Sequence, residues 1–336
     1  MMTHIWNEKD IESAATHLKD GEVVAFPTET VYGLGAVATN EEAVKKIFLA
    51  KGRPADNPLI IHVSNREQVA EYVKVIPEKA RLVMDHFWPG PCTIILEKKG
   101  SLALSVTGGL DTVGVRMPDH PIALKLIDRV GIPLAAPSAN SSGKPSPTSA
   151  EHVKRDLDRK IIGIIDGGPT GVGLESTVLD LTDPEKPTIL RPGGVSHEEL
   201  EKVIGKVAID THLVNPDAAP KSPGMKYRHY SPDKPVWILP ASIKESRRVM
   251  TELEENGEIV GLIASEENKR VWNTPSRLYF SIGEKKYPNQ AASLLYRALR
   301  ELDDSQATII LAEAYEEKGI GTAYMNRLSK AAEKRL

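Results

Sequence analysis

The chain has 336 residues, of which 40% are apolar and 26% charged, as in an ordinary globular protein with room for two domains. Its net charge of −3 excludes an electrostatic field that would draw the whole molecule to nucleic acid or an anionic membrane. A local basic patch is compatible with this net charge. The single cysteine, Cys92, excludes a disulfide framework and a cysteine-rich zinc site. Because it lies in an apolar run, we interpret it as a small buried side chain.

No apolar run approaches the roughly 20 residues that a membrane-spanning helix needs. The N-terminal stretch carries Glu8, Asp10 and Glu12 where a signal peptide would have an apolar core. We therefore expect a cytoplasmic location.

Short β-rich runs alternate with helix patterns from Val23 to about Ile204, which is typical of an α/β sheet. We expect strands at Glu22–Phe26, Leu59–Val63, Cys92–Leu96, Val113–Met117, Leu134–Ala136, Ile161–Ile165, Thr177–Leu181 and Thr188–Leu190. We expect helices at about Ile11–Lys19, Glu41–Ala50, Glu67–Val73, Glu78–His86, Pro121–Val130, Ala150–Leu157 and Ser196–Ile204. No helix pattern interrupts Ile161 to Leu190, so the predicted sheet is mixed and twisted.

A hydroxyl-rich loop follows the first strand, and cations follow the next helix. The polar residues of this region are Thr28, Glu29, Thr30, Lys51, Arg53, Asn57 and His62. Taken alone, Lys51 and Arg53 are more typical of a solvated basic helix end, and His62 of a buried core histidine. Taken together they favour a site for a phosphate-bearing ligand. Glu29, the only acid of its loop, is a possible base.

Arginines also lie in or end later strands. Arg116 stands among valines and Arg191 precedes Pro192, and a buried guanidinium needs a partner. That partner is either a bound carboxylate or phosphate, or a structural acid. Ser176 has no activating base near it in sequence, so we assign it to binding.

Small polar residues follow the strand that ends at Ala136. Ser138 and Asn140 stand where open α/β sheets place ligands, and a polar turn is an equally good interpretation. The stretch from Ser142 to Pro147 adds a cation and the Ser146 hydroxyl, which suit phosphate oxygens.

We divide the chain into a first domain over 1–204, a linker over 205–235 and a smaller domain over 236–336. Five prolines between Pro216 and Pro235 exclude a regular helix or central strand in the linker. Its run Lys226–Tyr230 favours a lid over a ligand cavity. Beyond Pro235, a Rossmann-like α/β domain is predicted by strands at Val236–Leu239, Ile259–Ala264 and Thr308–Leu311, and helices at about Ile243–Glu254, across Ala291–Leu302 and from about Ala323.

Common nucleotide, metal and hydrolase signatures are missing from the sequence. It contains no G-x-x-x-x-G-K-[ST] loop, no H-E-x-x-H pair and no G-x-S-x-G elbow. Cations and hydroxyls without an evident nucleophile indicate catalysis by positioning and charge stabilisation. Adenylyl transfer fits this description, because a carboxylate or carbamate attacks the α-phosphate and pyrophosphate leaves.

Nearly the whole chain resembles one known family. The matching pieces, in order, are Phe26–Gly35, Lys51–Val63, Trp88–Pro91, Gly109–Pro118, Ala136–Asn140, Ser146–Thr148, Asp166–Gly168, Glu175–Thr177, Leu190–Gly193, Pro223–Pro232 and Gly319–Arg327. They resemble the signature of the YrdC-type threonylcarbamoyl-AMP synthases in their two-domain form. The resemblance implies an open, twisted mixed sheet with a concave ligand cavity.

The resemblance also implies a reaction: L-threonine, bicarbonate and ATP would give L-threonylcarbamoyl-AMP and pyrophosphate. Mg²⁺ would be carried largely by the triphosphate, so no protein metal ligand is named. The product would pass to tRNA threonylcarbamoyl-transferase machinery that modifies tRNA beside the anticodon. Direct binding of tRNA by this protein is left open.

Carried over by motif, the residues divide into two sets. The threonine set is Thr30, His62, Arg116, Ala136 and Ser176. The ATP set is Lys51, Arg53, Asn57, Thr112, Ser138, Asn140, Ser146, Arg191 and Tyr230. Within the ATP set, Lys51 and Arg53 are the expected catalytic residues, and Tyr230 would close over the nucleotide.

Two alternative functions deserve comparison. An RNA-binding module is weakly supported, because net charge is slightly negative, aromatic residues are 5% and no aromatic RNA-binding strand appears. Carbamoyl transfer to another acceptor, as in hydrogenase maturation proteins that bear this domain, would come with a cysteine-rich region that one cysteine cannot provide.

Overall fold

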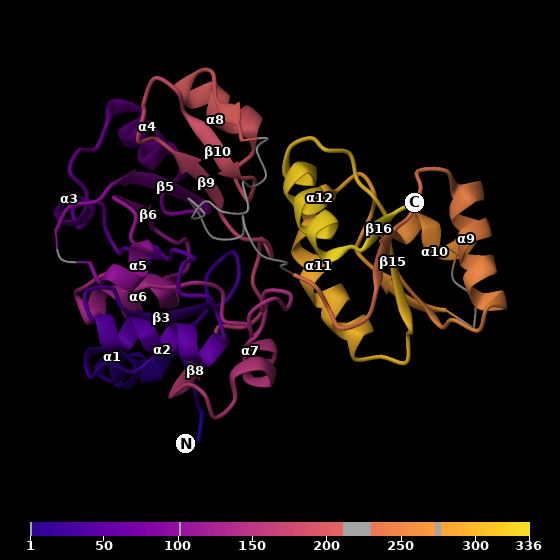
Figure 1. Ribbon diagram of the computed structural model, residues 1–336, viewed down its shortest axis with the longest axis horizontal. Coiled ribbons are helices and arrows are strands. Elements are labelled where there is room, and N and C mark those ends of the chain that lie inside the picture. Colours follow the sequence, from indigo (N-terminus) through magenta and orange to yellow (C-terminus); the bar gives the residue numbers. More distant parts are fainter. Residues whose placement is uncertain (1, 101, 211–229, 273–276) are drawn as a thin grey trace. The chain divides into compact units, whose positions relative to one another are not determined.

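The computed structural model describes residues 2–100, 102–210, 230–272 and 277–336, and these divide into two units (Figure 1). The first unit runs to residue 210 apart from two short segments, 143–145 and 172–174. The second unit holds those segments together with residues 230–336. Each unit is built on its own sheet.

An eleven-stranded sheet forms the first unit, in the order β1-β8-β2-β3-β7-β4-β6-β5-β9-β10-β11. Its strands are β1 (His4–Trp6), β2 (Val24–Phe26), β3 (Gly33–Val37), β4 (Ile60–His62), β5 (Cys92–Glu97), β6 (Thr112–Arg116), β7 (Leu134–Ala135), β8 (Gly163–Ile165), β9 (Thr177–Asp180), β10 (Thr188–Arg191) and β11 (Ala208–Ile209). Parallel pairs such as β4 with β6 alternate with antiparallel pairs such as β5 with β6. The predicted mixed sheet is confirmed.

One face of this sheet is covered by helices from several parts of the chain. The helices of the first unit are α1 (Ile11–Lys19), α2 (Glu41–Lys51), α3 (Val69–Tyr72), α4 (Glu78–Phe87), α5 (Leu104–Thr107), α6 (Pro121–Val130), α7 (Ala150–Leu157) and α8 (His197–Ile204), with a 3₁₀ turn, η1 (Glu8–Asp10). Apolar residues of α2, α4, α7 and α8 share one core with alternate strand residues such as Ile61, Val115 and Ile94. Because neighbouring strand residues point to opposite sides, the residues between them face the other way.

On the opposite face, helices of the described chain pack over one part of the sheet. Helices α1 and α6 pack on Val24 and Phe26 of β2 and on Leu134 of β7. Farther along the sheet, the apolar cluster consists of strand residues alone: Ile60, Ile95, Val178 and, partly buried, Leu190. This part of the face, over β4, β6, β5 and β9, is named the open face below because no described helix packs on its apolar cluster, although Ile60, Ile95 and Val178 of that cluster are buried. A pocket on it is lined by residues that include Ile60, Thr93, Ile95, Thr112, Gly114 and Val178.

The second unit is a five-stranded sheet in the order β14-β13-β15-β12-β16, and its paired strands are all parallel. The strands are β12 (Val236–Ile238), β13 (Val260–Ala264), β14 (Leu278–Ser281), β15 (Ile309–Ala312) and β16 (Lys334–Arg335). The helices are α9 (Ile243–Glu255), α10 (Glu266–Trp272), α11 (Pro288–Asp303) and α12 (Ile320–Ala331). A parallel sheet with intervening helices confirms the Rossmann-like prediction.

Strand β3 was not predicted, because two of its first three residues, Gly33 and Gly35, are glycines, which disfavour strands. The structure shows why glycine is needed there. A Cβ atom on Gly35 would lie 2.8 Å from the Phe26 ring, and one on Gly33 would lie 3.3 Å from it. Phe26 therefore occupies the space that side chains of β3 would take. The sequence also gave no sign of the short elements β1, α5, β11, β14 and β16, or of α10.

Two smaller expectations can be compared with the fold. Cys92 is fully buried, and burial raises the pKa of its thiol to about 12, so it packs as a small apolar side chain as expected. No helix in the described parts of the chain combines the length and the hydropathy that crossing a membrane would require.

Gly193 approaches the backbone of Glu175–Thr177 more closely than any side chain allows. A Cβ on Gly193 would lie 2.2 Å from the Thr177 nitrogen, whereas a Cβ on Gly171 would meet nothing closer than 3.9 Å. Gly193→Ala should therefore lower the free energy of unfolding by about 1–3 kcal/mol, the usual cost of overpacking. Urea unfolding measures this, with Gly171→Ala as the matched control. Equal stability of the two variants would contradict the close approach.

Candidate active site

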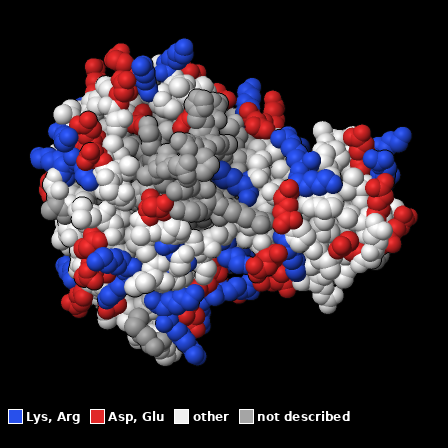
Figure 2. Space-filling view, viewed as in Figure 1, with Lys and Arg blue, Asp and Glu red and all other residues white. Residues whose placement is uncertain are grey.

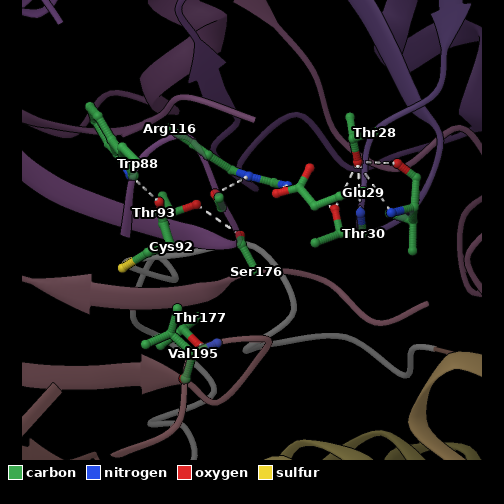
Figure 3. Close-up of polar contacts among 12 residues, drawn as sticks. Thr28, Glu29, Thr30, Trp88, Cys92, Thr93, Arg116, Ser176, Thr177 and Val195 are labelled. Carbon is green, nitrogen blue, oxygen red and sulfur yellow. Dashed lines mark hydrogen bonds and ion pairs between the residues drawn. The ribbon is translucent and has the colours of Figure 1, made fainter. Parts of the chain in front are cut away.

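Arg116 is a buried guanidinium at the end of β6, and it links three parts of the chain. Its Nη1 donates to Thr30 Oγ1 at 3.0 Å, and its Nε donates to the Gly90 carbonyl at 3.3 Å. Its Nη2 lies 2.5 Å from Glu29 Oε1, in an ion pair whose side chains are 5% and 13% exposed. The sequence left open a ligand or a structural acid as partner of Arg116, and here Glu29 occupies that position (Figure 3).

The loop after β2 is ordered by its own hydroxyls. Thr28 Oγ1 donates to the Val31 carbonyl at 2.6 Å and shares a 2.8 Å hydrogen bond with Thr30 Oγ1. Thr28 and Thr30 are both buried, so these bonds fix the Thr30 hydroxyl in front of Arg116. Figure 3 shows Glu29 projecting from the same loop toward the guanidinium.

His62 lies beside Arg116, because β4 and β6 are parallel and these two residues are register partners. The ring is buried, and it packs edge-on against Phe26 with the centroids 6.2 Å apart. Burial, and secondly the charge of Arg116, lowers the pKa of His62 from 6.5 to about 3. His62 is therefore neutral, and its buried Nδ1 makes no hydrogen bond with a described residue.

Ser176 precedes β9, the strand next to β5 in the sheet. Its hydroxyl forms a 2.8 Å hydrogen bond with Thr93 Oγ1, from β5. Arg191 donates through Nε and Nη2 to the Ser176 carbonyl at 3.1 and 3.0 Å, and through Nη2 to the Ser176 hydroxyl at 3.2 Å. Arg191 is thus a buried cation held directly against Ser176, which connects the predicted ATP set with the threonine set.

Lys51 organises a second group. Its buried ammonium, one residue before the left-handed Gly52 that ends α2, donates to the Ser138 and Asn140 carbonyls at 2.5 Å each. Ser138 Oγ in turn donates to Asn140 Oδ1 at 2.6 Å. The polar segment after β7 therefore surrounds the Lys51 ammonium, and its role in binding a ligand stays a prediction.

The remaining predicted residues of the first unit have these positions. Arg53 donates to the Asn57 and Pro58 carbonyls at 3.3 and 3.1 Å, and Asn57 is buried with no hydrogen bond to its Oδ1 from a described residue. Ser146 donates to Glu175 at 2.5 Å. Thr112 begins β6 on the open face, and Ala136 follows β7 with its amide donating to the Ile60 carbonyl at 3.0 Å.

Tyr230 belongs to the second unit, where its ring lies 5.4 Å from that of Tyr296 and 5.5 Å from the Arg327 guanidinium. Its φ of 66° is the left-handed conformation that few non-glycine residues adopt. Most of the predicted lid, residues 211–229, lies outside the described residues.

Two residues that contact predicted site residues were missed by sequence reasoning: Thr93, which is bonded to Ser176, and Glu175, which is bonded to Ser146. Glu175 stands inside a quoted motif, so its position was a usable signal. For Thr93 the only signal was its spacing, because it stands two residues before Ile95 in β5 and so lies on the same face of the sheet. The same spacing places three residues of the predicted threonine set and Thr93 on one side of the sheet. His62, Arg116, Thr93 and Ser176 are each two residues from an open-face residue of the same strand or its extension.

In the described parts of the chain, no group of three or more His, Cys, Asp and Glu side chains is arranged to hold a metal ion. The site is instead made of buried cations, hydroxyls and backbone carbonyls beside an open sheet face. The class of protein that this fold defines is an α/β protein with a large mixed sheet, and its buried arginines are side chains suited to binding a small anionic ligand.

Comparison with known families agrees with this class. Residues 16–193 match the Sua5, YciO and YrdC family, described as "Telomere recombination", and residues 195–333 match the "Threonylcarbamoyl-AMP synthase, C-terminal domain" family. The chain belongs to the Sua5/YciO/YrdC family, in its two-domain form.

Relatives cover the whole chain. Threonylcarbamoyl-AMP synthases of Bacillus subtilis and Pyrococcus abyssi are each 50% identical to it, over 97% of this chain and 94% of theirs. The crystal structure of P. abyssi Sua5 complexed with L-threonine is similar with a TM-score of 0.92 and 48% identity, over 99% of this chain and 100% of that chain. The resemblance read from the motifs is confirmed.

The buried, neutral His62 has a consequence for stability in acid. Its folded-state pKa of about 3 lies below the ordinary 6.5, so the unfolded chain takes up a proton first as the pH falls. Between pH 7.5 and 5 this should remove about 2 kcal/mol from the free energy of unfolding, and His62→Gln should lose that share of the pH dependence.

Urea unfolding of both proteins at the two pH values measures the difference. The same substitution at the exposed His86 is the matched control. An equally steep loss of stability in His62→Gln and the wild type would show that His62 is not the responsible group.

Proposed function

We propose that this protein is a threonylcarbamoyl-AMP synthase, which forms L-threonylcarbamoyl-AMP and pyrophosphate from L-threonine, bicarbonate and ATP. The observation that carries the proposal is Arg116, a buried guanidinium whose neighbours Thr30 and His62 belong to the motifs shared with the synthases. The threonine-bound relative, similar over the whole chain, supports threonine as the substrate.

In this proposal threonine lies against Thr30, His62, Arg116, Ala136 and Ser176. Arg116 pairs with its carboxylate, because a planar guanidinium fits a carboxylate with two parallel hydrogen bonds. Neutral His62 adds a hydrogen-bonding ring without a second positive charge beside Arg116. Ser176 and Thr30 offer hydroxyls to the substrate.

ATP in turn lies against Lys51, Arg53, Asn57, Thr112, Ser138, Asn140, Ser146 and Arg191, and Tyr230 covers the nucleotide. Lys51 and Arg53 are the catalytic cations, which stabilise charge on the phosphate oxygens as pyrophosphate leaves. Arg191 on Ser176 brings a buried cation between the two substrates. Mg²⁺ enters with the triphosphate, which is how this ion commonly binds at such sites.

The proposal also divides the chain by role. Residues 1–204 form the catalytic domain with a concave ligand cavity over the open face, 205–235 act as its lid, and 236–336 form the smaller domain. The product is passed in the cytoplasm to a tRNA threonylcarbamoyl-transferase.

The alternatives receive less support. On the face that Figure 2 shows, Lys and Arg of the described residues are interspersed with Asp and Glu, and the net charge is −3. Neither observation favours an RNA-binding module. Carbamoyl transfer to another acceptor has no cysteine-rich region to support it.

The reaction is tested by pyrophosphate release from the purified chain with ATP and Mg²⁺. We expect release only when both L-threonine and bicarbonate are present, because the carbamate formed from them is the nucleophile. Release that is indifferent to threonine would contradict the proposal, and measurable RNA binding in the same preparation would then promote the binding module.

Arg116→Gln should lower kcat/KM for threonine by at least about 100-fold, since it removes several charge-assisted hydrogen bonds at once. The control is Arg129→Gln, which removes an exposed arginine paired with Glu12 on the surface. A loss of the same size in both variants would mean that Arg116 has no special role. Circular dichroism checks that both variants fold.

A further inference from the structure

Glu29 is the most unusual charged group near the site. Its side chain is 13% exposed, yet neither carboxylate oxygen accepts a hydrogen bond from a described residue. Buried carboxylates are normally satisfied by two or more donors, and leaving them without donors is costly. The Thr28 and Thr30 hydroxyls beside it are engaged with each other and with Val31 and Arg116.

The contact of Glu29 with Arg116 is close but poorly aligned. The 2.5 Å separation makes it an ion pair, but neither Arg116 Nη2 nor the Glu29 oxygens are in hydrogen-bonding geometry. An arginine and a carboxylate in their best arrangement form two parallel hydrogen bonds. A carboxylate that approaches the guanidinium in its plane would therefore displace Glu29 from it.

A displaced Glu29 would need a cation of its own. His120 is near enough for the charge of Glu29 to raise its pKa, but burial lowers that pKa more, and the His120 Nδ1 already accepts the Ile122 amide at 3.3 Å. An α-amino acid brings both charges that the pair lacks, a carboxylate for Arg116 and an ammonium group next to it for Glu29.

We propose that Glu29 holds Arg116 in the empty site and, when the amino acid binds, gives up Arg116 to the substrate carboxylate and binds the substrate α-ammonium. This deepens the proposed function and rests on it, because it makes Glu29 the residue that selects α-amino acids over hydroxy acids. Such an exchange keeps every buried charge paired in both states, which avoids the cost of an isolated charge.

The inference is tested by calorimetric titration with two ligands, L-threonine and (R)-3-hydroxybutanoate, which lacks only the amino group. Wild type should prefer threonine by about ten- to hundredfold, the worth of a charge-assisted hydrogen bond. In Glu29→Gln the preference should fall to nearly one, through weaker threonine binding and unchanged or tighter binding of the hydroxy acid. The tighter binding is expected because Glu29 no longer competes for Arg116.

Glu22→Gln is the matched control, since Glu22 is also paired with a cation, Lys46 at 2.8 Å. Glu29→Asp keeps the carboxylate and should keep part of the preference. If Glu29→Gln retains the wild-type preference, Glu29 serves only as a structural partner of Arg116 and the inference is overturned.

The wild type alone also decides the matter if Glu29→Gln does not fold. Equal affinity for the two ligands would overturn the role of Glu29 and leave the proposed function intact. Binding of neither ligand, together with threonine-independent pyrophosphate release, would overturn both.

Discussion

A buried guanidinium must be paired, and this requirement at Arg116 dictates how the first unit is assembled around it. Its partners come from two other parts of the chain: Glu29 and Thr30 from the loop after β2, and Gly90 from the segment before β5. Moving any of these partners would remove a contact from the buried Arg116 guanidinium, and this fixes the positions of the loop and the strand around it. The neighbouring His62 stays neutral, because burial and, secondly, the charge of Arg116 lower its pKa.

The second constraint is the alternation of side chains along mixed strands. On one side of the sheet these side chains meet a large helical core. On the other side, in the described part of the chain, helices α1 and α6 pack on residues of β1, β2, β3, β7 and β8. The open face carries Ile60, Ile95 and Val178, and a polar residue stands two positions away from each of them along its strand or the strand's extension. Gly114 leaves room for the side chains beside it on this face. A Cβ at this position would lie 3.2 Å from Thr93 and 3.3 Å from Ile60, which is closer than ordinary contact.

Much of this could be predicted from the sequence, and the exceptions have physical causes. Amphipathic patterns gave every helix of the first unit longer than four residues, since apolar periodicity reports directly on burial. Strand β3 could not be found, because its glycines are set by the distant Phe26 ring. The motifs indicated Arg116 and Lys51, but only the fold reveals that Glu29 faces one and that carbonyls of 138 and 140 surround the other.

The central claim is that bicarbonate carbon becomes part of the adenylate formed from threonine. Mass spectrometry of the AMP-containing product, made with ¹³C-bicarbonate, tests it most directly. The account predicts threonylcarbamoyl-AMP that carries a single ¹³C in its carbamoyl carbon. An unlabelled adenylate of threonine itself would contradict it, because Arg116 would then not hold the threonine carboxylate away from the phosphate.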